Sequence, residues 1–500
     1  MKPGTLLTLT VLCAIFLYAQ VFILPAVPIL ISGDQSLYLH DGTRMLDGQV
    51  IYRDYDHFTF PGTDWLYMIL FKLFGVRAWI APAALVILGS CTAALTMLMT
   101  RGVIAGPSAY LPGLLFVSLP FASDLDATHH WFSAVFTTAA ITVAIGKRSL
   151  PRLFSAGVLI GLATFFTQSA CLLALGIAMF LLWERSQENQ PWRVLARKEA
   201  CLLLGFVASL IPCLSYFVHA VGLKQFLYWT VVFVVKYYPA DWFNTWRVYL
   251  SGFPGLHRSS AFNIPAFVLV HLIVPFVYIP ALVTCISRST AVSAESRKRV
   301  TFLAVTGLFL FLSVASAPAA VRLYSVSAPA LVLLIWFLYS QGRWHRWLIA
   351  LWAVLLLTVV VRPVIAQRNT LRLNLPIGRT AFLSPAVYEK CQWMSPRSQR
   401  LDYFFNDPLL AFALRLRNPS RVSYLRPTDY TRPEEVEDAM QALEKFHVRF
   451  VSWPKELDDD KEAARHPEGN HLGPLRAYLE QRYHLAHTFS NGDQIWERER

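Results

Sequence analysis

Residues 6–62 join a long apolar run to a polar loop: LLTLTVLCAIFLYAQVFILPAVPILI is followed by SGDQSLYLHDGTRMLDGQVIYRDYDHFTFPG. The apolar run, residues 6–31, is long enough to cross a bilayer core as a helix, which takes roughly 20 apolar residues. It exceeds the roughly 7–15-residue core of a secretory signal, and no small-x-small cleavage site follows it. The sequence therefore predicts a first membrane span at residues 6–31 and a polar loop, residues 32–62, at one membrane face.

The composition of the whole chain is typical of a membrane protein. Hydrophobic residues make up 55% of the 500 residues and charged residues 15%, whereas a soluble chain carries about 25% charge. The mean hydropathy is +0.43. We therefore predict a polytopic α-helical membrane protein with about eleven transmembrane helices. The predicted spans lie near residues 6–31, 78–100, 108–122, 129–146, 152–167, 168–183, 199–221, 263–286, 300–316, 323–340 and 347–366.

Basic residues cluster in alternate loops, as positive-inside bias predicts for the cytoplasmic side. If Lys2 lies in the cytoplasm, all of these clusters are cytoplasmic, and the odd number of spans places the C-terminus outside. The clusters are Lys147/Arg148/Arg152, Arg185/Arg193/Arg197/Lys198, Arg288/Arg297/Lys298/Arg299 and Arg343/Arg346. The net charge of +13 is thus assigned to topology and not to a nucleic-acid partner. The segments predicted outside are residues 32–62, 123–130, 222–262 and 317–322.

A change of composition after residue 366 indicates a second domain. The remaining residues are polar and contain no spanning segment. Residues 433–446 and 475–483 have helical spacing, and residues 447–453 alternate like a strand. We predict a transmembrane domain at residues 1–366 and a small soluble, extracytoplasmic α/β domain at residues 367–500.

Asp34 is the first acid of the outer loop and stands directly before a predicted amphipathic helix, residues 35–46. One interpretation is structural, because an aspartate suits the N-cap of such a helix. The other is chemical: a carboxylate at the mouth of a membrane cavity can accept a proton from a hydroxyl nucleophile. A cap hydrogen bond would lower the pKa of the carboxyl group and weaken it as a base. The pattern leaves both interpretations open.

A set of residues in and around this loop has the order found in a known family. The set is Asp34 after the first span, Tyr38, Leu46-Asp47-Gly48, Tyr52-Arg53-Asp54 and Pro61-Gly62. It resembles the first extracytoplasmic loop of GT-C glycosyltransferases, most of all bacterial relatives of dolichyl-phosphate-mannose protein mannosyltransferases and the lipid A aminoarabinose transferase. The resemblance covers residues 1–100 well and the later spans by architecture. Where the family usually has Asp-Glu, this chain has Asp34-Gln35, so only the first acid is matched.

The resemblance implies a membrane glycosyltransferase. Its donor would be a sugar on a polyprenyl phosphate, used at the outer face of a bacterial plasma membrane, where nucleotide sugars are absent. Asp34 would be the general base that deprotonates the acceptor hydroxyl, with inversion at the anomeric carbon. Cationic or hydrogen-bonding groups would stabilise the leaving phosphate. The acceptor stays open between a lipid, a protein hydroxyl and a polysaccharide.

Further candidates follow Asp34 in the same loop. Asp54 and Asp56 form a D-x-D pattern, for which recognition of sugar or acceptor hydroxyls is favoured over metal binding. D-x-D chelation belongs to enzymes with nucleotide-sugar donors, so no metal ligand is assigned, although a divalent metal stays open as a cofactor. Tyr38, Arg53 and His57 are added as substrate-binding candidates.

Three later outer segments supply the other candidates. In the turn at residues 123–130, the GT-C pattern implies Asp126 as a second catalytic acid, with His129 and His130 binding substrate. The alternative there is a polar helix end, and a zinc site would need further ligands. Arg322 and Lys236 are candidates for the lipid phosphate. Their alternatives are a snorkelling arginine and an interfacial lysine in an aromatic belt.

Two rival functions belong to other classes. A transporter or flippase for a lipid-linked saccharide predicts ionisable residues within spans and repeat symmetry. The sequence shows few of the former and none of the latter. A non-catalytic protein whose outer domain binds cell-wall components predicts no effect of removing Asp34. We therefore predict an enzyme, with membrane lipids and a lipid-linked sugar as partners.

Overall fold

The computed structural model describes residues 2–251, 269–286, 293–340, 347, 350–352, 354, 361, 370–459 and 467–499. The chain forms two compact units, each built from separate parts of the sequence. Unit 1 comprises Met1–Val21, Ala83–Ser215 and Trp246–Arg368, and unit 2 comprises Phe22–Pro82, Tyr216–Thr245 and Asn369–Arg500. The predicted domain boundary between residues 366 and 367 lies outside the described residues, so the division at that point stays a prediction.

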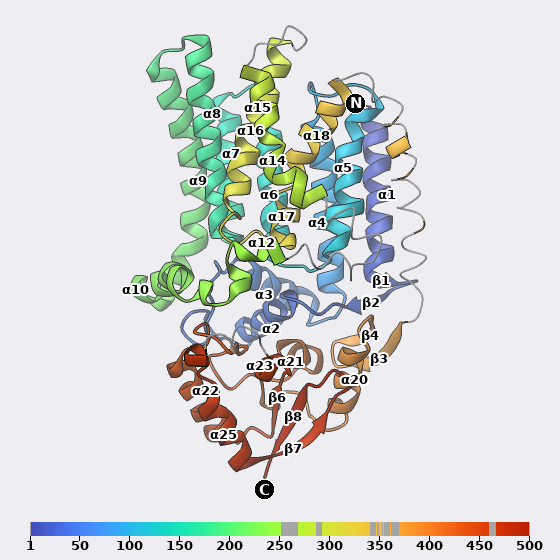
Figure 1. Cartoon of the computed structure of the whole chain (residues 1–500), viewed down its shortest axis with the longest axis vertical. Helices are drawn as coiled ribbons and strands as arrows, with labels where there is room; N and C mark the ends of the chain where they lie inside the picture. Colours follow the sequence, from blue (N-terminus) through green and yellow to red (C-terminus); the bar gives the residue numbers. More distant parts are fainter. Residues whose placement is uncertain are drawn as a thin grey trace. The chain divides into compact units, whose positions relative to one another are not determined.

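Unit 1 is helical (Figure 1). Its helices are α1 (Pro3–Val21), α4 (Ile80–Met99), α5 (Leu111–Phe116), α6 (His129–Ala144), α7 (Leu150–Phe166), α8 (Leu172–Glu188), α9 (Trp192–Val221), α12 (Arg247–Ser251), α14 (Val274–Phe276), α15 (Tyr278–Ile286), α16 (Ala294–Leu312), α17 (Ala320–Ser325) and α18 (Ala328–Ser340). The first residues of α4 and the last of α9 belong to unit 2.

Among the described residues, four helical stretches are long and apolar enough to cross a membrane. They are Pro3–Val21, Ile80–Met99, Gln168–Glu188 and Trp192–Val221, and shorter apolar stretches cover Pro107–Phe121, Leu150–Phe166, Leu269–Cys285 and Ala328–Ser340. This pattern supports a multi-pass membrane protein. The number of about eleven spans stays a prediction, because the predicted spans at 263–286 and 347–366 lie partly outside the described residues.

Small residues let two of these helices approach closely. A Cβ atom added at Gly157 of α7 would collide with the backbone of Leu202 in α9, and one added at Gly205 of α9 would collide with Phe154. Ser209 Oγ of α9 also donates a hydrogen bond to the Val158 carbonyl across the contact, at 3.0 Å. Small residues and hydroxyl groups are what membrane helices use at such contacts, because lipid gives no hydrophobic drive for helix association.

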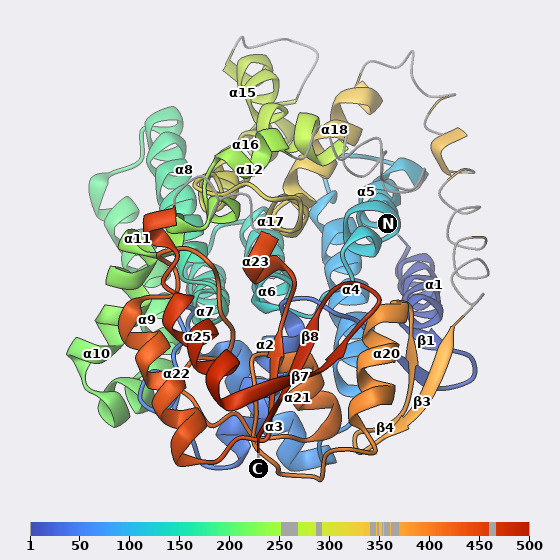
Figure 2. The ribbon, with the colours of Figure 1, turned by 60° about the horizontal axis from the view of Figure 1, so that its bottom comes forward.

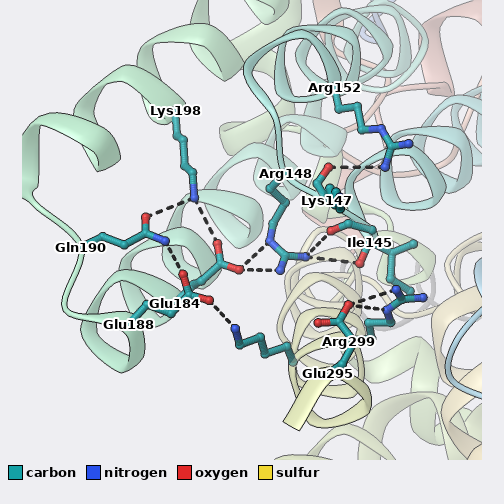
Figure 3. A network of polar contacts seen from close by, with 12 residues as sticks. Ile145, Lys147, Arg148, Arg152, Glu184, Glu188, Gln190, Lys198, Glu295 and Arg299 are labelled. Carbon is teal, nitrogen blue, oxygen red and sulfur yellow. Dashed lines mark hydrogen bonds and ion pairs between the residues drawn. The ribbon is translucent and has the colours of Figure 1, made fainter.

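An ion-pair network joins the ends of several unit 1 helices (Figure 3). Glu184 of α8 is 4% exposed and accepts a hydrogen bond from Arg148 Nε at 2.9 Å. Lys198 Nζ of α9 lies 3.4 Å from its other oxygen. Glu188 pairs with Lys298 of α16. Basic clusters predicted to share one membrane face therefore lie together at one end of these helices. Their cytoplasmic side stays a prediction, and Arg288, Arg343 and Arg346 lie outside the described residues.

Unit 2 begins where the predicted first span stops being a helix. We expected one span over residues 6–31, but α1 ends at Val21 and two strands follow, β1 (Phe22–Ile23) and β2 (Val27–Leu30). Pro25 and Pro28 explain the difference, since proline lacks the N–H that a continuing helix needs. The apolar side chains are buried instead in a small sheet.

This first sheet has the order β1-β2-β4-β3, with β3 at Leu371–Leu375 and β4 at Gly378–Phe382. β2 runs parallel to β4, and the other two pairs are antiparallel. Ile23, Ile29 and Ala381 form its buried core. The sheet therefore ties the chain that follows α1 to the segment that begins at residue 370.

The second sheet has the order β5-β6-β8-β7. Its strands are β5 (Phe404–Phe405), β6 (Phe450–Trp453), β7 (Tyr483–Thr488) and β8 (Gln494–Arg498). α22 (Pro433–Lys445) and α25 (Gly473–Arg482) pack beside it (Figure 2). These elements coincide with the helices and the strand predicted at 433–446, 475–483 and 447–453. The other helices are α20 (Pro385–Met394), α21 (Pro408–Leu414) and α23 (Glu456–Asp459).

The first polar loop contains α2 (Gln35–Leu46), at the predicted position, and leads into α3 (Gly62–Phe74). The two helices pack closely, because a Cβ atom at Gly42 would lie 2.8 Å from Tyr67 Cβ. Phe71 of α3 stacks on Phe412 of α21. The remaining helices of unit 2 are α10 (Leu223–Leu227) and α11 (Val234–Lys236). This packing fixes the face of α2 that carries the candidate residues.

Candidate functional site

Three ionisable side chains meet between α2 and α3. Asp41 comes from α2, His57 from the loop that follows, and Asp64 from the first turn of α3. His57 Nδ1 lies 3.3 Å from Asp41 Oδ2, and His57 Nε2 lies 3.9 Å from Asp64 Oδ2. All three are buried, and both acids are 0% exposed. We call this group the Asp41–His57–Asp64 cluster.

A hydroxyl group connects the cluster to Tyr38. His57 Nε2 is 2.6 Å from Thr59 Oγ1, and the same oxygen is 3.5 Å from the Tyr38 hydroxyl. The Tyr38 and His57 rings meet edge to face, with centroids 5.4 Å apart. Tyr38 stands four residues after Asp34. It therefore links the buried cluster to the N-terminal end of α2.

Arg44, also on α2, is the buried cation beside Asp41. Its Nη1 donates to Ser423 Oγ at 3.3 Å, and that hydroxyl donates to Asp41 Oδ1 at 3.2 Å. Its Nη2 donates to the Ser420 carbonyl at 2.9 Å, and the guanidinium lies over the Tyr55 ring at 4.6 Å. Arg44 therefore ties α2 to the C-terminal part of unit 2 and offsets part of the charge of Asp41.

The surroundings of the cluster shift two of its pKa values. Burial raises the pKa of Asp64 to about 7; the charge of Asp41 adds to this rise, and His57 opposes it. For His57, burial acts to lower the pKa, but the charge of Asp64, the hydrogen bond to Asp41 and the charge of Asp41 outweigh it, so the pKa is raised. Buried carboxylates favour any nearby positive charge. The cluster therefore holds a proton, or another cation, more strongly than solvated residues would.

The sequence pattern indicated His57 as a candidate, but neither Asp41 nor Asp64. One signal was available for Asp41: it follows Tyr38 by three positions and so shares its helix face. Asp64 gave no such signal, because an acid in the first turn of a helix is explained by the helix dipole alone. Only the packing of α2 against α3 brings the two acids to one histidine.

Asp34 is the residue directly before α2, as predicted, and it is exposed. Its side chain does not accept the capping hydrogen bond that the structural interpretation expected. Burial raises the pKa values of Tyr38 and Tyr424, and the charge of Asp34 adds to both rises. Asp34 therefore lies beside tyrosines from two distant parts of the sequence.

The contact of Gln35 accounts for an amide at the position where the Asp-Glu pair has its glutamate. The side chain is buried, and its Nε2 donates a hydrogen bond to the Ile31 carbonyl at 2.7 Å. An ionised glutamate has no hydrogen to donate to that carbonyl. The amide thus anchors the start of α2 to the end of the first sheet's strand segment, in a contact that the ionised acid cannot make.

A pocket opens beside His57. Its walls include Asp56, His57, Phe58, Phe233, Tyr424 and Tyr430. The ring of Phe58 stacks on Phe233 at 6.0 Å and meets Tyr238 at 4.6 Å, and the hydroxyl groups of Tyr424 and Tyr430 are hydrogen-bonded to each other. Its accessible volume of about 30 Å³ has room for one or two water molecules, so the pocket must widen before a sugar ring can bind against these aromatic faces.

Asp56 is the acid of this pocket. Its Oδ1 accepts a hydrogen bond from Arg421 Nη2 at 3.0 Å. Burial raises the pKa of Asp56, and the charge of Arg421 opposes that rise. Asp56 is therefore held in place at the pocket wall by an arginine from the C-terminal segment.

The other candidates of unit 2 lie nearer the surface. Asp54 accepts hydrogen bonds from Arg53 at 2.7 Å and from the Val50 backbone at 2.7 Å, and the first of these contacts lowers its pKa. These bonds brace the turn before Asp56. Lys236 ends α11, is exposed, and lies over the Tyr237 ring with Nζ 4.9 Å from the centroid.

The remaining candidates belong to unit 1. His129 and His130 open α6, and their rings lie 3.9 Å apart. His130 lines a pocket with hydroxyl side chains from α6 and α17, among others. Arg322 is near enough to His130 for a charge interaction between the two side chains. Arg322 Nη1 also donates to the Ala317 carbonyl at 2.8 Å. Asp126 precedes α6, and its backbone carbonyl accepts from the Thr128 N–H at 2.8 Å.

The candidates thus fall into two groups. Asp34, Tyr38, Arg53, Asp54, Asp56, His57 and Lys236 belong to unit 2, whereas Asp126, His129, His130 and Arg322 belong to unit 1. The individual roles of these residues stay predictions.

Comparison with known proteins identifies the fold. The chain matches no protein-family model and no curated protein. Among solved structures it is similar to ArnT from Cupriavidus metallidurans bound to undecaprenyl phosphate, with a TM-score of 0.60 and 13% identity over 99% of this chain and 98% of that one. The apo oligosaccharyltransferase of Archaeoglobus fulgidus gives a TM-score of 0.56 and 12% identity over 100% of this chain and 75% of that one.

A third structure agrees with these two. The Archaeoglobus fulgidus oligosaccharyltransferase AglB in complex with an inhibitory peptide and a dolichol phosphate has a TM-score of 0.52 and 13% identity, over 99% of this chain and 74% of that one. The resemblance to GT-C glycosyltransferases predicted from the first polar loop is therefore confirmed at the level of the fold.

Proposed function

We propose that this protein is an integral membrane glycosyltransferase that moves a sugar from a polyprenyl-phosphate donor to an acceptor hydroxyl. The observation that carries the proposal is the likeness, over nearly the whole of both chains, to ArnT bound to undecaprenyl phosphate. The dolichol phosphate of the AglB complex is a second polyprenyl-type phosphate on the same fold. We place the reaction at the outer face of a bacterial plasma membrane, with the N-terminus in the cytoplasm.

In the proposed reaction, Asp34 is the general base. It takes the proton of the acceptor hydroxyl while that oxygen bonds to the anomeric carbon. The bond from this carbon to the phosphate oxygen breaks, with inversion, and the polyprenyl phosphate leaves with the electron pair. Exposure of Asp34 at the start of α2, beside Tyr38 and Tyr424, supports this role, because a base must be within reach of the acceptor.

The other residues bind and stabilise. Asp126 is proposed as the second catalytic acid, and Arg322 and Lys236 as the cations that stabilise the charge developing on the leaving phosphate. Asp56 and His57, in the wall of the aromatic pocket, would bind hydroxyl groups of sugar or acceptor.

Five further residues complete the proposed substrate contacts. Tyr38 would contact substrate beside Asp34. Arg53 and Asp54 would do so at the surface turn, and His129 and His130 at the start of α6. The hydroxyl acceptor and the identity of the sugar are not specified by these contacts.

The test compares Asp34→Asn with the parent and with Asp47→Asn, an acid of the same loop outside the proposed site. Membranes containing each protein are supplied with radiolabelled polyprenyl-phosphate sugars, and transfer to lipid, protein and polysaccharide fractions is measured. We expect Asp34→Asn to lose at least about 100-fold of the transfer rate, the usual contribution of a general base, and Asp47→Asn to retain it.

Equal transfer by Asp34→Asn and the parent would contradict the role of Asp34. Movement of the labelled saccharide across vesicles without transfer to any acceptor would instead favour a transporter or flippase.

A further inference from the structure

The Asp41–His57–Asp64 cluster has the composition of a metal site, and of its three residues only His57 has a role in the proposed transfer reaction. One ligand atom from each residue can be chosen so that all three lie within 4.8 Å of one another. Each side chain comes from a different element: α2, the loop after it, and α3. Two carboxylates and one imidazole are thus brought together in the interior of unit 2.

The oxygens of the two acids lack the partners that buried charges need. Neither oxygen of Asp64 has a hydrogen-bond partner among the residues the structure describes, and in the same part of the chain the contact of Asp41 Oδ2 is with the His57 ring nitrogen at 3.3 Å. The Tyr55 hydroxyl is buried without a hydrogen-bond partner among the described residues. Buried polar atoms are almost always hydrogen-bonded, so this concentration of exceptions points to a missing ligand.

His57 stands between the two acids, with Nδ1 nearest to Asp41 and Nε2 on the side of Asp64. The 2.6 Å contact between Nε2 and Thr59 Oγ1 fits either tautomer of the ring, because the hydroxyl group can donate or accept. In the tautomer with the proton on Nε2, Nδ1 presents its lone pair to Asp41 Oδ2 at 3.3 Å. Two lone pairs facing each other repel unless a cation lies between them. Metal-binding histidines typically donate their other ring N–H to a fixed acceptor in this way.

We propose that Asp41, His57 and Asp64 bind a divalent transition-metal ion, Zn²⁺ or Mn²⁺, through one atom of each side chain. Imidazole nitrogen suits zinc, and carboxylate oxygen suits both zinc and manganese. One divalent ion neutralises the two carboxylates and gives both acids a shared partner. Without a metal ion, the cluster reaches the same net charge only if His57 is protonated and Asp64 also carries a proton.

The proposed ion would stabilise the scaffold of the candidate site. It would join α2, the loop at residue 57 and α3 at one point, and α2 carries Asp34 at its first turn. Because the ligands are buried, the ion holds the loop and does not contact the acceptor. This inference rests on the donor atoms and their burial, not on the proposed transferase activity.

The experiment uses the full-length protein in detergent, treated with chelator and then dialysed against Zn²⁺ alone or Mn²⁺ alone. Metal content is measured by mass spectrometry, and the midpoint of thermal unfolding is recorded with and without the metal. We expect about one tightly bound ion per chain and a higher midpoint with metal. Asp47→Asn serves as the matched control for Asp64→Asn, which should lose at least about tenfold in affinity.

Three outcomes overturn the proposal: no ion in the parent above the detergent blank, no change of its unfolding midpoint with metal, or equal binding by Asp64→Asn. The first two would identify a cluster balanced by protons only, and they are measured on the parent, so a misfolded variant does not affect them. Neither readout depends on sugar transfer. Failure of the metal site is therefore separable from failure of the proposed function.

Discussion

Two buried polar clusters of this protein differ in how the charge of their acids is compensated. In unit 1, Glu184 has two cations, Arg148 and Lys198, within 3.5 Å. In unit 2, Asp41 and Asp64 have one histidine between them, and three of their four oxygens have no hydrogen-bond partner among the described residues. The first cluster is complete within the chain, and its role is to hold helix ends together. The second is incomplete, and an incomplete buried cluster is where a ligand is to be sought.

A third cluster shows that the number of acids per cation and the number of hydrogen bonds to those acids are separate properties. Lys390 Nζ of α20 lies 3.1 Å from Asp407 Oδ2 and 2.6 Å from Asp493 Oδ2, so again two acids share one cation. Here, however, Asp407 accepts from the Leu410 N–H at 3.0 Å and Asp493 accepts from the Lys455 N–H at 2.9 Å. Two acids to one cation is therefore not unusual in itself. What distinguishes the cluster of unit 2 is that, within the described part of the chain, neither oxygen of Asp64 accepts a hydrogen bond.

The largest expected effect is on the complete cluster. Glu184→Gln leaves two buried cations without their acid, which should cost about 3–5 kcal/mol of unfolding free energy. Glu188→Gln removes a pair that is about 30% exposed and should cost about 0–1 kcal/mol. Chemical unfolding in detergent measures both. If the two variants lost equal unfolding free energy, the burial of Glu184 would not explain its contribution to stability.

A smaller loss is expected at Lys390. Lys390→Gln leaves Asp407 and Asp493 facing each other and should cost about 2–3 kcal/mol near neutral pH, less than the loss of a fully buried partner. Burial acts to raise the pKa of Asp493, but Lys390 and the other donors outweigh it, so the pKa is lowered. A lowered pKa gives stability that is present above the ordinary value of 3.8 and is lost as the pH falls through the folded-state value.

The pH series checks this sign. The parent should lose stability below about pH 4, and Lys390→Gln should lose less over the same range, since its Asp493 has less favourable charge interaction to forfeit. Parallel curves for the two proteins would show that Lys390 does not set the pKa of Asp493.

The smallest expected effect has the opposite sign. In chelator-treated protein, Asp64→Asn replaces an unpartnered buried carboxylate with a neutral amide, so unfolding free energy should rise by about 1–2 kcal/mol or stay unchanged. The same substitution should abolish the stabilisation by added Zn²⁺. Thermal unfolding with and without the ion separates the two effects. A loss as large as that of Glu184→Gln would show that Asp64 already has a complete set of partners in the chain.

The sequence predicted the local elements of the site well. Helix α2 begins at Gln35 and ends at Leu46 as expected from its amphipathic pattern, and Asp34 stands before it. The first span was predicted too long, because β1 and β2 are as apolar as the helix they follow. Hydrophobicity reports burial and not the kind of element, and the two prolines were the only local sign of the change.

The sequence by itself determined what short-range chemistry determines: the apolar runs, the clustering of basic loops, the helix after Asp34 and the likeness to GT-C enzymes. The tertiary structure decided which side chains meet. Asp41 and Asp64 are 23 positions apart and reach His57 only because Gly42 lets α3 pack against α2. Ser423 reaches Asp41 from the far end of the chain. Such contacts depend on long-range packing, which no local pattern of residue types encodes.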